Sequence, residues 1–95
     1  MAEPLSLAAN IVGVAVPALH VARLLLDDLE AIVDAPKAVE SLKGDLESVD
    51  SALESLRRIN DAEWKSLGVT VAHESKAAIT ACERTCDMFR ADLKR

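Results

Sequence analysis

The residues of this chain that could do chemistry are two histidines, two cysteines and a run of carboxylates. His20 and His73 stand far apart in the sequence, and the apolar neighbours of His20 favour a partly buried or interface histidine over a catalytic base. The Asp27-Asp28-x-Glu30 cluster has the residue types of a general acid/base pair. It lacks an opposing partner, however, and such a run is more often a solvated helix face.

Cys82 and Cys86 lie four residues apart in a helical pattern, so they share a face with nearly parallel side chains, which is poor geometry for a disulfide. Together with His73 they have the residue types of a soft metal site. The apolar stripe of the same segment needs both cysteines, so we expect no metal. Two thiols in so short a chain suit a reducing compartment and predict a cytoplasmic protein.

The sequence contains no motif that an enzyme or a cofactor-binding protein would require. A Gly-rich phosphate loop, HExxH, a CxxC pair and a GxSxG elbow are all missing. We therefore expect no enzymatic activity and no cofactor.

The charge of the chain is unevenly distributed. The net charge is −5, which argues against nucleic acid as a partner because phosphate binding needs a basic stripe. Residues 1–26 sum to zero, residues 27–63 hold eleven acids and four bases (−7), and residues 64–95 hold six bases and four acids (+2). The start, Met-Ala-Glu-Pro, lacks the positive region of a signal peptide.

Proline and glycine divide the chain into three long helical blocks. The first is predicted from about residue 5 to 33, with a kink near Pro17, and ends before Pro36 because the residue preceding a proline avoids the α region. The second runs from about 36 to 60, and the third from about 69 to 94. Between the last two, the link at residues 60–64 could begin a brief helical turn, with Trp64 anchoring it against the bundle.

Apolar residues recur every three or four positions in the second and third blocks, as on the buried face of a helix. The second block has the strongest pattern, and the third is weaker because three of its members are small or polar. In order, the stripes are Val39, Leu42, Leu46, Val49, Leu53 and Leu56, then Ala72, Ser75, Ile79, Cys82, Cys86, Phe89 and Leu93.

The first block contains eighteen consecutive residues without formal charge, Leu5 to Ala22. As a helix this stretch spans roughly 27 Å, close to a bilayer core of about 30 Å. It is apolar on more than one face, which is typical of a helix that is either deeply buried or lipid-facing. Ala9 and Gly13 form a small-xxx-small pair that permits close helix–helix approach in either setting. Both interpretations remain open, and they are compatible if the helix is buried at rest and released on activation.

The opening LSLAANIVGVAVPALHVARLL and the junction Asp34-Ala35-Pro36-Lys37 resemble the fungal N-terminal domain of STAND proteins, the HeLo-like group of the HET-S HeLo superfamily. Members typically begin Met-Ala-(Asp/Glu)-Pro-Leu-Ser and continue with an apolar helix, an Asp-Ala-Pro-like junction, a long amphipathic helix and a Trp-containing link. The chain follows this order as far as Trp64. The N-terminal stretch and the junction are the more specific parts of the resemblance.

The resemblance implies a helical bundle at the N-terminus of an intracellular NOD-like receptor or related cell-death protein, followed by a nucleotide-binding module. On oligomerisation such a bundle inserts its N-terminal helix into membrane, so the implied location is cytoplasmic and, conditionally, the plasma membrane. Carried onto this sequence, the inserting element is Leu5 to Leu26, and Glu3 is the acid that lines a pore or is protonated near one. The chain is shorter than HeLo-type domains usually are, which favours self-association.

We therefore expect one all-α domain over residues 1–95, a small antiparallel bundle of three long helices plus a short connecting turn. The alternative function is a homotypic protein-interaction adaptor whose first helix never leaves the core. The membrane-insertion candidates are Glu3, Leu5, Leu7, Ile11, Val12, Val14, Val16, Leu19 and Val21. The helix-packing or interface candidates are Ala9, Gly13, Val39, Leu42, Leu46, Val49, Leu53, Leu56, Trp64, Ile79, Phe89 and Leu93.

Overall fold

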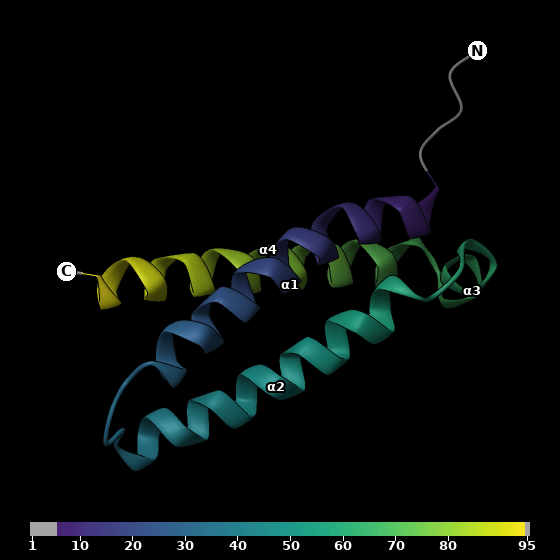
Figure 1. Cartoon of the computed structure of the whole chain (residues 1–95). Coiled ribbons are helices and arrows are strands. Elements are labelled where there is room, and N and C mark those ends of the chain that lie inside the picture. Colours follow the sequence, from purple (N-terminus) through teal and green to yellow (C-terminus); the bar gives the residue numbers. More distant parts are fainter. Residues whose placement is uncertain (1–5, 95) are drawn as a thin grey trace.

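The computed structural model describes residues 6–94 and consists of four helices joined by short turns (Figure 1). They are α1 (Leu7–Glu30), α2 (Lys37–Arg57), α3 (Asp61–Leu67) and α4 (Val69–Leu93). No strand occurs within the described residues. The prediction of an all-α fold with three long helices and a short connecting turn is confirmed.

The beginning of α1 is fixed by a local cap, and its end by a turn. The Ser6 hydroxyl accepts a hydrogen bond from the Ala9 N–H at 3.0 Å, which satisfies one of the amides left free at a helix start. The helix continues through Pro17. It ends three residues earlier than the predicted block, and Asp34 in the following turn has φ 54°, a left-handed conformation that Asp tolerates better than most residues.

The short helix α3 has a complete capping box. The Asn60 side chain accepts the Glu63 N–H at 2.8 Å, and the Glu63 carboxylate accepts the Asn60 N–H at 3.1 Å. Gly68, with φ 102°, then redirects the chain into α4. The predicted helical turn is therefore present, and Asn60 caps it.

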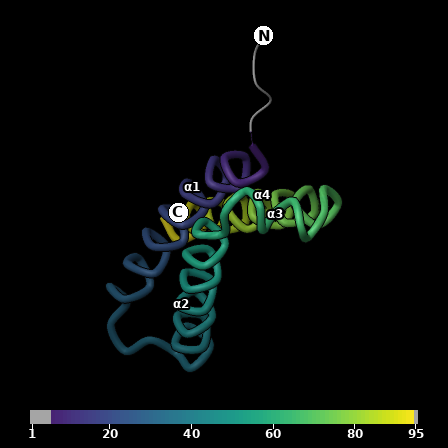
Figure 2. The backbone as a smooth tube through the Cα atoms, turned by 90° about the vertical axis from the view of Figure 1, so that its right-hand side faces the viewer, coloured from purple at the N-terminus to yellow at the C-terminus, as the bar shows by residue number. Residues whose placement is uncertain are grey.

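The four helices form an elongated molecule of 55 × 22 × 17 Å in which α1 is central. Helices α2 and α4 each pack along α1, and α3 closes the end of the molecule at which α1 begins. From that end α2 and α4 splay apart (Figures 1 and 2). The second and third long helices therefore share a neighbour rather than a long mutual interface.

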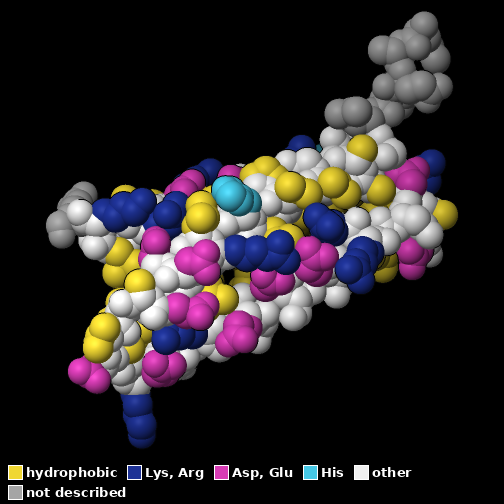
Figure 3. All heavy atoms as spheres, viewed as in Figure 1, with side chains coloured by type: hydrophobic (Ala, Val, Ile, Leu, Met, Phe, Trp, Pro, Cys, Tyr) yellow, Lys and Arg dark blue, Asp and Glu magenta, His cyan; other side chains and the backbone are white. Residues whose placement is uncertain are grey.

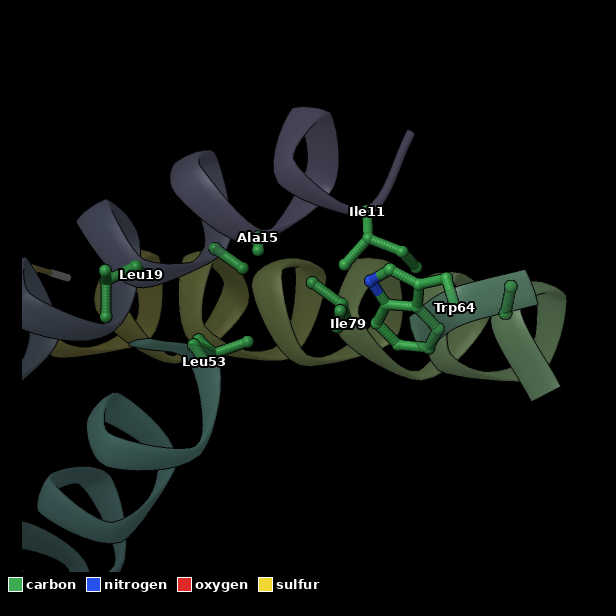
Figure 4. Close-up of a cluster of buried hydrophobic side chains, with 8 residues drawn as sticks. Ile11, Ala15, Leu19, Leu53, Trp64 and Ile79 are labelled. Carbon is green, nitrogen blue, oxygen red and sulfur yellow. The ribbon is translucent and has the colours of Figure 1, made fainter. Parts of the chain in front are cut away.

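The buried core is concentrated on α1. Of the thirteen buried apolar residues in the described part of the chain, seven belong to this helix. Trp64, only 1% exposed, packs beside Ile11 of α1 and Ile79 of α4 (Figure 4), which confirms the anchoring role predicted for it. A second cluster near the α1–α2 turn joins Leu25 to Cys86 of α4. The α1 members of the core are Ile11, Ala15, Ala18, Leu19, Ala22, Leu25 and Leu29.

The predicted stripes face the core, but neither is covered along its whole length. On α2 only Leu46 and Leu53 are buried, and Val39, Leu42, Val49 and Leu56 are half-buried because α2 has one long neighbour.

On α4 the stripe is buried at Ala72, Ile79 and Cys86. Phe89 and Leu93 remain 40% and 41% exposed, so they do not complete the packed face within this chain, and an interface role for them stays a prediction. Phe89 lines the opening between α2 and α4, which splay apart (Figures 1 and 2), and Leu93 lies beside the end of α1.

Truncating Trp64 tests the anchoring role. We expect Trp64→Ala to lower the free energy of unfolding by about 3–5 kcal/mol, the usual loss for removing a buried Trp side chain. Trp64→Phe should cost clearly less, because Nε1 has no protein hydrogen-bond partner among the described residues and the phenyl ring still fills much of the space. Urea unfolding followed by far-UV circular dichroism measures both. A loss for Trp64→Ala well below this range would show that the site tolerates a cavity and that Trp64 does not anchor α3.

Candidate interaction surfaces

The structure divides the membrane-insertion candidates between the core and the surface of α1. Ile11 and Leu19 are buried, while Val12 and Val16 are 36% and 42% exposed. Glu3 and Leu5 lie outside the described residues. The half-buried candidates are Leu7, Val14 and Val21.

The exposed side of α1 forms an uncharged strip over its first two-thirds. Figure 3 shows hydrophobic side chains gathered along this helix next to a histidine. We call this surface the α1 ridge; it consists of Ala9, Val12, Gly13, Val16, Pro17 and His20.

Two features expected of this helix lie on its surface. His20 is exposed, because it lies on the side of α1 that faces away from α2 and α4, so of its two expected settings the interface stays a prediction. Ala9 and Gly13 are also exposed, and a Cβ at Gly13 would meet nothing within 4 Å, so no close helix approach uses this pair here. A role for the pair between molecules stays a prediction.

The N-terminal turn of α1 is held by a carboxylate from α3. Asp61 accepts a hydrogen bond from the Ala8 N–H at 3.2 Å and pairs with Lys65 at 3.2 Å. The bond from the Ala8 amide, together with Lys65, holds the pKa of Asp61 below its usual value. The free amides at the start of a helix favour a nearby negative charge, which stabilises this contact. The contact connects two residues that are 53 positions apart in the sequence.

Ion pairs tie α1 to both of its long neighbours. Arg23 pairs with Asp50 at 2.6 Å and with Glu54 at 3.2 Å on α2, and the guanidinium lowers the pKa of Asp50. Arg90 of α4 pairs with Asp28 of α1 at 2.8 Å. The carboxylate cluster at Asp27-Asp28-x-Glu30 thus contributes one packing contact, and its other two members are exposed.

An apolar groove lies between α2 and α4, with Leu25 of α1 among the residues that line it. Its volume is about 350 Å³, and Asp45 is its one charged lining residue in the part of the chain that the structure describes. The exposed ring of Phe89 contributes to its wall. We call this surface the α2/α4 groove; its remaining lining residues are Leu42, Leu46, Val49, Ala78, Ala81, Cys82, Thr85 and Cys86.

Residues 2–95 match a protein family described as pigment biosynthesis cluster protein PigL N-terminal. The chain belongs to this family. No curated protein and no solved structure matches the chain. The family description names a gene cluster and no activity, and a STAND-type receptor, cell death and membrane insertion stay predictions.

The thiols of this PigL N-terminal domain are free, and one is chemically quiet. Burial and the neighbouring Cys82 raise the pKa of Cys86 to about 11, so it is protonated at neutral pH. His73 does not join them: the described residues contain no group of three or more His, Cys, Asp or Glu side chains placed to hold a metal ion.

Sequence reasoning missed the contacts that position α1. Arg23 is the one basic residue in the first 26, followed by an acidic middle segment, and this contrast was the available signal for an ion pair between the first two helices. No such signal pointed to the Asp61–Ala8 and Arg90–Asp28 contacts, because the chain contains many other acidic and basic residues that could have formed similar contacts.

Removing the Asp61 carboxylate should loosen the start of α1 in this PigL N-terminal domain. Because the folded-state pKa of Asp61 is lowered, its contribution to stability is present above the ordinary value of 3.8 and is lost as pH falls through the folded-state pKa. We expect Asp61→Ala to lower the thermal midpoint at pH 7, and the difference from the parent chain to shrink towards pH 2.

The matched control is Asp27→Ala on exposed α1 surface, which should change the midpoint little at either pH. A difference between the Asp61 variant and the parent that stays constant down to pH 2 would contradict the charged cap.

Proposed function

We propose that this PigL N-terminal domain is a non-enzymatic signalling module that self-associates and then delivers α1 into a membrane. The supporting observation is the composition and packing of α1. By length and apolar content this helix could cross a membrane, a test that the core helix of a soluble protein also passes. Only 33% of its 18-residue apolar window is buried, so two-thirds of the window is already partly or fully outside the core.

The charges on α1 are arranged in a way that suits such a transfer. Leu7 to Ala22 contains no charged residue and spans roughly 24 Å as a helix, while Arg23 and the carboxylates after it cluster in the last third. An inserted α1 would therefore keep its charges near the headgroups, where they cost little. Pro17 and the small residues of the ridge are tolerated in membrane helices.

The resemblance to the HeLo-like N-terminal domain of STAND proteins supports the same function. On that proposal the domain precedes a nucleotide-binding receptor module, resides in the cytoplasm, and acts at the plasma membrane in regulated fungal cell death after oligomerisation. Self-association is the step that would make the transfer possible, because α1 carries seven of the thirteen described buried apolar residues, and its departure uncovers their partners.

The central place of α1 favours a second candidate function, a homotypic adaptor. All three other helices pack on α1, so its release would dismantle the bundle rather than open a flap. In the adaptor, α1 stays in the core and the exposed apolar surfaces bind other copies without any membrane step.

A charge placed on the α1 ridge separates the two functions. Val16 is 42% exposed, so Val16→Glu should leave the fold intact, and the matched control Val71→Glu changes a valine of 41% exposure on α4. A charged side chain at the centre of a membrane helix costs about 3 kcal/mol. We therefore expect Val16→Glu to reduce dye release from phosphatidylcholine vesicles at least tenfold, and Val71→Glu to leave it unchanged.

Dye release should be measured with the parent chain and also with Asp61→Ala. This variant should cause faster dye release, because the start of α1 is held less tightly in the bundle. Equal dye release by the two glutamate variants would reject insertion of α1. No dye release by the parent or by Asp61→Ala, in a protein that assembles in solution, would favour the adaptor.

A further inference from the structure

None of the residues that form the ion pairs between α1 and its two long neighbours lines the α2/α4 groove. On α2, Asp50 and Glu54 turn towards Arg23, whereas the side of α2 that lines the α2/α4 groove carries Leu42 and Val49. The groove side of α4 is similar, with alanine, cysteine, threonine and Phe89. Although 28% of the residues in the chain are charged, Asp45 is the one charged residue that lines this groove of about 350 Å³ in the described part of the chain. An exposed apolar surface of this kind is typical of an interaction site.

The groove and the α1 ridge lie on opposite sides of the molecule. Leu25, which lines the groove, follows Val16 of the ridge by nine residues, or two and a half turns of an α-helix. The two side chains therefore point in opposite directions. The ridge is convex and uncharged, and the groove is concave with one carboxylate, so a single molecule can present both to two different neighbours.

We propose that the α2/α4 groove is the docking site for the α1 ridge of a second copy of this chain, so that the domain assembles head-to-tail. The small side chains of the ridge, Ala9 and Gly13 above all, let its backbone approach the groove closely, as between packed helices. A docked ridge supplies the fourth long helix that the splayed α2 and α4 lack. This inference rests on the self-association step of the proposed function.

The polar groups of the two surfaces match as well as their shapes. The ridge carries the exposed His20, whose ring N–H can donate a hydrogen bond, and the groove carries one carboxylate, Asp45, which can accept it. Ridge-to-groove contact is therefore favoured over groove-to-groove contact, which would bring two Asp45 carboxylates together. The ridge-to-groove contact is heterologous and leaves one ridge and one groove free at the ends of each assembly.

Two surface variants test this geometry. Val16→Glu spoils the ridge, and Ala81→Glu places a charge on the exposed lining of the groove. Sedimentation velocity of the parent chain over a range of concentrations should show species that grow beyond the dimer. Each variant alone should sediment as a monomer, because each lacks one of the two surfaces. An equimolar mixture should form a one-to-one dimer, since the intact groove of one variant receives the intact ridge of the other.

The matched control is Ala77→Glu, an exposed alanine of α4 outside the groove, which should assemble like the parent. Unchanged circular dichroism verifies that every variant is folded. A monomeric mixture, a variant that still assembles alone, or a parent chain that is monomeric at all concentrations would overturn the proposal. Failure of the membrane step is a separate outcome, because a parent chain that assembles head-to-tail and releases no dye rejects membrane insertion only.

Discussion

The packing of every other helix against α1 is the constraint on which the rest of this structure depends. The side of α1 that faces the core carries Ala15, Ala18 and Ala22 between larger residues, so neighbouring helices can approach it closely. Two long helices use that opportunity on its two flanks, and α3 closes its first turn through Trp64 and Asp61. A domain of this size buries a modest fraction of its surface. Because the buried residues are concentrated on α1, contacts that do not involve this helix contribute little to the stability of the fold.

The half-buried surfaces follow from the same arrangement. Because α2 and α4 both lean on α1 and splay apart, the apolar stripe of each is covered on one side and open on the other. Phe89 and Leu42 show the consequence, since both belong to regular apolar stripes and both line the open groove. The groove therefore results from two long helices sharing α1 as their partner, and its low charge distinguishes it from the surfaces that carry the ion pairs.

The helices could be predicted from the sequence because their signals are local. Pro36, Gly68 and the Asn60 cap mark boundaries, and the stripe of α2 has a regular period over more than two heptads. The spatial relations could not be predicted in this way. A stripe shows that a face is apolar, but not whether one helix or two will cover it, so it could not show that Phe89 would stay exposed within the chain. The contacts of Asp61 and Arg90 join residues 53 and 62 positions apart, and nothing local selects those partners.

The two kinds of contact on α1 differ in how they would respond to a change of surroundings. Burial of its apolar side chains is non-directional, and a lipid interior would satisfy Ile11 or Leu19 about as well as the bundle does. The bonds from Asp61, Asp50 and Arg90 are directional and exist only in the bundle. On the proposed function, the apolar side chains suit α1 to either environment, and the polar contacts favour the bundle because they are lost on transfer. Weakening the polar contacts would then shift α1 towards the membrane without altering a single core residue.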